Sequence, residues 1–161
     1  MIKFSKQTAF FLCFVLCAWV AGGAGPVSTP TPTAQNPRGI IFVEVEGFKV
    51  EAGEICAMLY SGPDGFPFKP EKAFKTKRIQ VVGKKVQVVF TDIGYGTYAL
   101  SVYHDENKNG KLDTIWFGPP SEGVGSSNNA KGFMGPPSFK DASFIHNATE
   151  TRQSIRVVHI F

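Results

Sequence analysis

Cysteine is scarce in this sequence of 161 residues, and the positions of the cysteines matter more than their number. Two of the three, Cys13 and Cys17, lie within the first 25 residues, and the third is Cys56. If the N-terminal stretch is removed, as argued below, one remaining cysteine excludes an intramolecular disulfide framework. Cys56 lies in the apolar run 55–60, which is typical of a buried, unreactive thiol.

A strong excess of one charge is also lacking. The chain has 17 Lys and Arg against 13 Asp and Glu, but two basic residues and no acidic ones lie in residues 1–25. The remainder therefore carries 15 basic and 13 acidic residues, a net charge near +2, and its lysines and arginines are scattered. This pattern argues against a nucleic-acid partner.

No apolar run reaches the roughly 20 residues of a membrane-spanning helix. The longest, 8–20, follows Lys3 and Lys6 and precedes the small residues 21–25. This order predicts a secretory signal peptide over 1–25, cleaved near Ala24, with no transmembrane segment left afterwards and a periplasmic or secreted location. The alternatives are an uncleaved anchor and a lipid-modified Cys17, although Leu16 stands where the latter needs a small residue.

Catalytic motifs are missing as well. Gly125-Ser126-Ser127 does not match the GxSxG turn of a serine hydrolase, and no phosphate-binding glycine loop is present. The histidines, His104, His146 and His159, share no metal-ligand spacing, which argues against a zinc or copper site. The sequence therefore assigns no catalytic residues.

The remaining pattern is one of short strands. Residues 26–38 form a Pro/Thr-rich linker, and apolar and polar residues then alternate over a domain that we place at 39–161. We expect an all-β fold, an antiparallel Ig-like or transthyretin-like sandwich of about seven strands. The turn 83–85 predicts a hairpin between its flanking strands, and residues 70–74 predict one helical turn. The stretch 104–140 is a long loop insertion.

The strongest local motif begins this insertion, in residues 105–113. Oxygen-bearing side chains recur at alternate positions, and Gly110 permits a sharp turn, as at the start of an EF-hand calcium loop. The motif predicts calcium as the cofactor, with ligands Asp105, Asn107, Asn109, Lys111 (through its carbonyl) and Asp113. Trp116 stands where an EF-hand has its bidentate Glu, so Glu122 or Asp141 would complete the site. The alternative is a metal-free loop held by Asx turns.

The rest of the insertion alternates aromatic residues with Gly, Pro, Ser and Asn. One interpretation is a ligand-binding loop that uses aromatic faces and amide groups, namely Trp116, Asn128, Asn129, Phe133 and Phe139. The competing interpretation, which the general burial of aromatic residues favours, is a surface loop packed on its own sandwich.

Three segments together resemble a known family: LYSGPDGFPFKPEKAF, SVYHDENKNGKLDT, and WFGPPSEGVGSSNNAKGFMGPPSFKDASF. They are similar to bacterial exported proteins grouped as domain of unknown function 2141, over about residues 39–161. The resemblance implies a periplasmic or secreted β-sandwich like the transthyretin-like and B-type surface modules, and no established catalytic residues. In the B-type modules a similar Asp-x-Asn-x-Asn-Gly loop holds calcium.

These observations predict an exported, calcium-stabilised β-sandwich that acts as a binding or structural module of the cell envelope, with an unidentified envelope or extracellular partner. One alternative is a transthyretin-like hydrolase of a small molecule, using His104 with Lys111 and Asp113 nearby in sequence. Another is a purely structural envelope component that associates through the Phe66 and Phe68 loop.

Overall fold

The computed structural model describes residues 36–116 and 118–160, so the predicted signal peptide and most of the predicted linker lie outside the described residues. Strands dominate this part of the chain: β1 (Arg38–Glu46), β2 (Glu54–Tyr60), β3 (Lys75–Gln80), β4 (Lys85–Gly94), β5 (Gly96–Asp105), β6 (Val124–Ser126), β7 (Ser143–His146) and β8 (Glu150–Arg156). The helical elements are short: η1 (Pro70–Lys72), η2 (Ser127–Asn129) and α1 (Phe139–Ala142). The expected helical turn is confirmed by η1.

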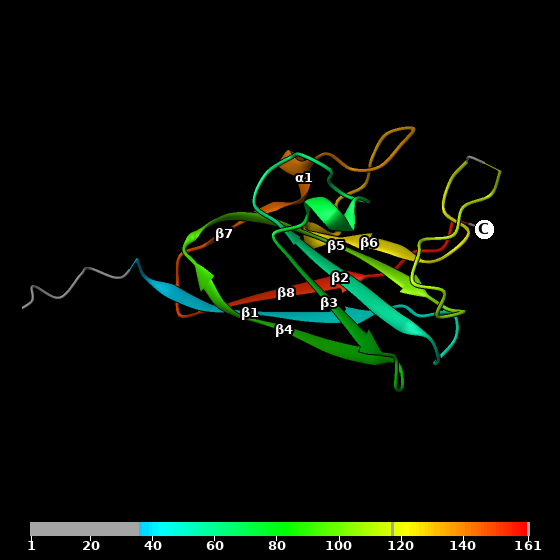
Figure 1. Ribbon diagram of the computed structural model, residues 1–161, viewed down its shortest axis with the longest axis horizontal. Helices are drawn as coiled ribbons and strands as arrows, with labels where there is room; N and C mark the ends of the chain where they lie inside the picture. The colour runs from blue at the N-terminus through cyan, green and yellow to red at the C-terminus, as the bar shows by residue number, and fades with distance from the viewer. Residues whose placement is uncertain (1–35, 117, 161) are drawn as a thin grey trace, which may run out of the picture. The chain divides into compact units, whose positions relative to one another are not determined.

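Two sheets make up the fold, which confirms the predicted all-β sandwich. One has the order β4-β1-β8, and the other has the order β3-β2-β5-β6, with β7 also paired to β5 (Figure 1). All pairings between these strands are antiparallel except that of β1 with β8, which is parallel. Because β8 is reached from the other sheet through β7, it can enter beside β1 in either direction.

The core lies between the sheets and follows from the alternation of the strands. Ile41, Val43 and Val45 of β1 are fully buried, and Val88 of β4 and Val102 of β5 face the same cluster. Burying one such side chain contributes about 1.5–3 kcal/mol, so this face dominates the stability of the domain.

The five-stranded sheet is covered on its second face as well. Cys56, Met58 and Tyr60 of β2 form a separate buried cluster with Tyr103 of β5, and Phe66 packs over it. This confirms that the strand 55–60 is buried on both sides. Burial also raises the pKa of the Cys56 thiol, which fits an unreactive cysteine.

The predicted hairpin around residues 83–85 is wrong. Strand β3 pairs with β2, and β4 pairs with β1 in the other sheet, so residues 81–84 cross between the two sheets. Val81 still belongs to the β2 edge, since its N–H donates to the Gly53 carbonyl at 3.1 Å. Gly83 does make a turn with positive φ (80°), but the turn connects two layers because β4 has the apolar face that matches β1.

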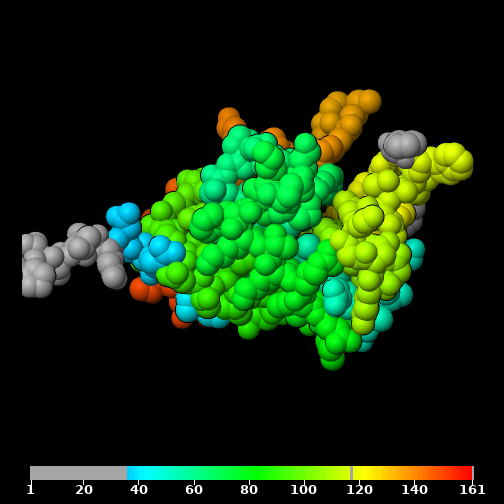
Figure 2. Space-filling model, viewed as in Figure 1, coloured from blue at the N-terminus to red at the C-terminus, as the bar shows by residue number. Residues whose placement is uncertain are grey.

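The long insertion leaves the sandwich at the end of β5, and it carries much of the surface beside the sheet edges. It contains β6, η2 and two segments, around 106–116 and around 131–137, that project from the body of the sandwich (Figure 2). Within the part of the chain that the structure covers, helices are too short or too polar to cross a membrane.

Candidate functional site

The acidic loop, residues 105–113, begins at the last residue of β5. Asp105 is fully buried, and its carboxylate accepts backbone N–H groups from Asn109 (3.0 Å) and Gly110 (2.8 Å). Lys108 and Gly110 have positive φ angles of 60° and 83°, so the chain curls tightly around this carboxylate. The curl is the one that the spacing of the motif predicts.

The other side chains of the motif converge on Asp113. The Asn107 amide donates to its carboxylate at 2.7 Å, and the Asn109 amide donates to both of its oxygens at 2.9 Å. The Asn109 amide oxygen in turn accepts the N–H of Lys111 at 2.8 Å. The set provides two carboxylates and two amides on one bend, so it can hold a hard cation or a network of Asx turns.

Arg78 of β3 supports the back of the acidic loop. Its guanidinium donates to Asp105 at 3.1 Å, to the Gly110 carbonyl at 2.6 Å and to the Tyr103 hydroxyl at 2.7 Å. Burial raises the pKa of Tyr103, so this hydroxyl stays neutral and keeps its proton to donate. Any cation in the loop would share the Asp105 carboxylate with Arg78.

Glu122 ties the two ends of the acidic loop together. Its side chain is buried, and its carboxylate accepts the N–H of Glu106 (3.0 Å) and the N–H of Asp113 (3.0 Å). Burial raises its pKa, while the two backbone donors act in the opposite direction. Asp141, the other residue considered as a last calcium ligand, instead bonds to Ser138 at the start of α1.

Residues 114–116 and 118–120 form the two arms of a short projecting hairpin directly after the acidic loop. Thr114 bridges to Pro120, and the N–H of Ser121 donates to the Asp113 carbonyl at 3.0 Å. Trp116 lies on this hairpin and is 93% exposed. The hairpin is therefore held at its base by the same residues that organise the acidic loop.

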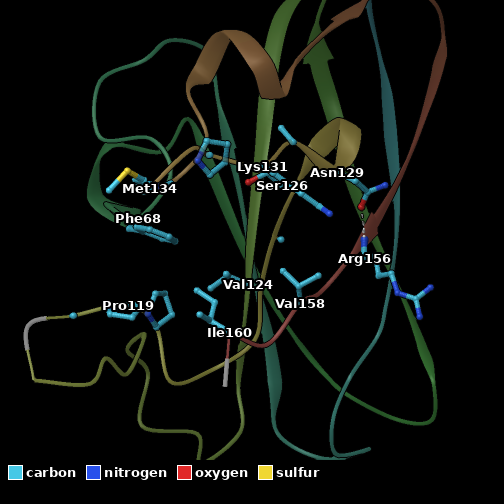
Figure 3. Close-up of a pocket in the computed structure, with 18 of the residues that line it drawn as sticks. Phe68, Pro119, Val124, Ser126, Asn129, Lys131, Met134, Arg156, Val158 and Ile160 are labelled. Atoms are coloured by element: carbon cyan, nitrogen blue, oxygen red, sulfur yellow. Dashed lines mark hydrogen bonds between the residues drawn. The ribbon is translucent and has the colours of Figure 1, made fainter.

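A groove of about 1050 Å³ lies between this hairpin, the segment 130–137 and the edges of the two sheets (Figure 3). Apolar groups line most of it, including Phe68, Pro119, Val124, Met134, Val158 and Ile160. Asn129 and Arg156 lie away from Phe68 and Met134 in the close-up (Figure 3). The groove has the size and lining of a small-molecule or peptide site.

The five residues predicted to bind a ligand are divided by the structure. Asn128 donates to the carbonyls of Asp141 and Ser143, so its amide anchors η2 to α1 and β7. Asn129 does line the groove, but its amide bonds to Ser154 and Arg156 of β8. These hydrogen bonds give both amides a role in folding the insertion.

The three aromatic members of that set also differ. Phe139 packs edge-on against Phe66, with ring centroids 5.9 Å apart, as in the competing interpretation of a self-packed loop. Phe133 is 95% exposed beside Met134, and Trp116 is exposed on the hairpin. Sequence reasoning missed most of the groove, because Phe68, Val158 and Ile160 come from segments far apart in the chain.

The hydrolase alternative paired His104 with Lys111 and Asp113. In the described residues, His104 instead contacts the Ala52 carbonyl (Nε2 to O, 2.6 Å), Phe48 and Glu106, while Asp113 bonds to the amides of the acidic loop. The third predicted role is association through the Phe66 and Phe68 loop. In the structure, Phe66 is half-buried and packs against the buried cluster beside Tyr60, and Phe68 lines the groove.

The family model described as "Uncharacterized protein conserved in bacteria (DUF2141)" matches residues 43–154, well over half of the chain. The chain belongs to the DUF2141 family. This match runs from within β1 to within β8 and includes the acidic loop and the groove-lining insertion. Comparisons with curated proteins and with solved structures return no significant match.

Proposed function

We propose that this DUF2141 protein is an exported binding module of the cell envelope, whose groove receives a largely apolar ligand and whose acidic loop binds calcium. The observation that carries the proposal is the groove of about 1050 Å³, one wall of which continues directly from the acidic loop. Pro119 and Pro120 belong to that wall, six and seven residues after Asp113.

Calcium acts on the groove through the backbone in this proposal. The ion takes oxygens from Asp105, Asn107, Asn109, Asp113 and the Lys111 carbonyl. The Asn107 and Asn109 amide oxygens then exchange the N–H groups of Asn109 and Lys111 for the ion. Asp113 is then fixed, and Asp113 in turn positions the hairpin through Glu122 and Ser121. Ordering the hairpin before a ligand arrives lowers the entropy cost of binding.

The ligand is inferred from the lining alone. Phe68, Met134 and Ile160 offer apolar surface, and the cations Lys131 and Arg156 border it. An amphipathic ligand, with an apolar body and an anionic end, complements this distribution. The predicted signal peptide supports an envelope location, which fractionation of the cell and sequencing of the mature N-terminus would test.

A fluorescent anionic apolar probe, anilinonaphthalene sulfonate, tests the groove. We expect the purified protein to bind it more tightly in calcium than in chelator, and Met134→Glu to weaken that binding in both. Val82→Glu is the matched control, because Val82 is an exposed apolar residue (76%) outside the groove lining. Equal probe binding by wild type and Met134→Glu would contradict the groove, and equal binding with and without calcium would contradict the coupling.

A further inference from the structure

We propose a second metal site, distinct from the calcium site of the acidic loop, in which His104, Glu106 and His159 bind a divalent transition metal of the zinc class. One ligand atom from each of these residues lies within 4.8 Å of the other two. The residues come from the end of β5, the start of the acidic loop and the segment that follows β8. Their separation in sequence, 53 residues between Glu106 and His159, conceals the site from motif reasoning.

His104 is the decisive residue. Its side chain is fully buried, and Nε2 lies 2.6 Å from the Ala52 carbonyl, an arrangement that places the ring proton on Nε2. Nδ1 therefore presents a lone pair, yet among the described residues it has no hydrogen-bond partner. A buried acceptor without a donor is costly, whereas a metal ion would use this lone pair directly.

The other two ligands face the same nitrogen. Glu106 Oε1 lies 3.8 Å from His104 Nδ1 and 3.2 Å from His159 Nε2. With metal–nitrogen and metal–oxygen distances of about 2.0–2.1 Å, tetrahedral coordination places ligand atoms about 3.3 Å apart. The side chains of Glu106 and His159 are partly exposed, at 30% and 14%. Small rotations of these side chains therefore bring the ligand atoms to this spacing, and an ion can enter from solvent.

The surrounding packing holds the histidines in position. Phe48 packs against the His104 ring with centroids 5.1 Å apart. The backbone N–H of His104 donates to the Gly123 carbonyl at 2.8 Å, and a Cβ on Gly123 would lie 2.6 Å from His159 Nε2. Only glycine therefore leaves room for the His159 ring beside β5.

The donor set selects the metal. Two imidazole nitrogens and one carboxylate suit zinc and its neighbours, whereas calcium prefers six to eight oxygens. Three protein ligands leave one position for water. Binding would clamp the segment after β8 to the end of β5, and this segment contributes Val158 and Ile160 to the groove.

His146 resembles His104 in its buried ring but, within the described part of the chain, has no neighbouring metal-ligating side chains. His146 is also fully buried, and its Nε2 also lacks a hydrogen-bond partner among the described residues. Its neighbours are Thr151, at 2.6 Å from Nδ1, and the rings of Tyr95 and Tyr98, none of which is a typical zinc ligand. His146 is therefore the matched control for the site.

The test is titration of the purified, untagged protein with zinc by calorimetry and with cobalt(II) by visible absorption. We expect one equivalent to bind, with the intense visible absorption of tetrahedral cobalt and with a raised melting temperature. His159→Gln and Glu106→Gln, at partly exposed positions, should weaken binding by at least about 100-fold, since even second-shell changes cost 10- to 100-fold. His146→Gln and Asp113→Ala should bind the metal as wild type does.

Several results would overturn the site. The first is that the wild type binds no stoichiometric zinc. The second is that His159→Gln and Glu106→Gln both keep the wild-type affinity. The third is that a folded His146→Gln or Asp113→Ala loses zinc binding. Circular dichroism of each variant establishes that it is folded. Because excess calcium should not displace the zinc, and calcium binding should survive in His159→Gln, failure of this site is distinguishable from failure of the calcium proposal.

Discussion

Alanine substitution of the two carboxylates of the acidic loop separates a calcium site from a loop held only by Asx turns. Asp105 is fully buried and accepts three hydrogen bonds, from Asn109, Gly110 and Arg78. At about 1 kcal/mol net for each bond, Asp105→Ala should cost about 3 kcal/mol even without calcium. Asp113 is half-buried and bonds mainly to two exposed amides, so Asp113→Ala should cost less than about 1 kcal/mol without calcium.

Asp105→Ala and Asp113→Ala should show the same loss of stabilisation by calcium. A ligand present at 100 times its dissociation constant adds about 2.7 kcal/mol to the unfolding free energy of a protein that binds it. We expect wild type to gain this amount and both Asp105→Ala and Asp113→Ala to gain almost none. Urea unfolding, followed by circular dichroism in calcium and in chelator, measures these three calcium increments.

A surface aspartate outside the acidic loop provides the matched control. Asp64→Ala removes a surface aspartate that pairs with Lys72 and contributes no ligand to the acidic loop, and it should keep the full calcium increment. The reasoning fails if Asp113→Ala is stabilised by calcium as much as wild type, or if wild type gains nothing. In the second case the loop is held by its internal hydrogen bonds alone.

Three further outcomes follow from single contacts. Burial raises the pKa of Tyr60 to about 12, so the stability that this phenol contributes is present below pH 10 and is lost as the pH rises toward 12. Tyr60→Phe should therefore remove roughly 2–3 kcal/mol of that alkaline loss in urea unfolding. Gly123→Ala should destabilise the fold by about 1–3 kcal/mol and weaken zinc binding, because its Cβ would clash with Val157 and with the His159 ring. An unchanged urea midpoint would argue against this packing. Trp116→Ala should leave the urea midpoint within about 0.5 kcal/mol of wild type, since the side chain is 93% exposed; a larger loss would mean that Trp116 packs on the domain.

The sequence predicts strands better than it predicts their partners. Alternation in residues 41–46 and 97–104 locates β1 and β5, although only β1 buries a single regular face, whereas residues 98–105 of β5 are buried on both faces. The same signal cannot show that β3 and β4 belong to different sheets, since a glycine turn serves a hairpin and a crossover equally well. The parallel entry of β8 beside β1 likewise depends on a connection through the other sheet.

The candidate sites show a similar division. The acidic loop is predictable, because its side chains lie within nine residues and Gly110 fixes the bend. The histidine cluster is not, because His159 reaches Glu106 only after β8 has paired with β1 and Val158 has bridged to Val124. The groove depends on the same tertiary contacts. A chemically typical pattern is therefore readable only when it is local.

Asn129 closes the outer edge of β8 in a way that limits how the groove can be used. Its amide oxygen accepts the Arg156 N–H at 2.8 Å, and its amide nitrogen approaches the Ser154 carbonyl at 3.5 Å, so one side chain imitates the peptide of an adjoining strand. An incoming polypeptide therefore finds these two backbone groups of β8 already hydrogen-bonded, and it cannot pair with them as an added strand. A ligand beside Arg156 must therefore be recognised through contacts with side chains, which select it by its shape and polarity.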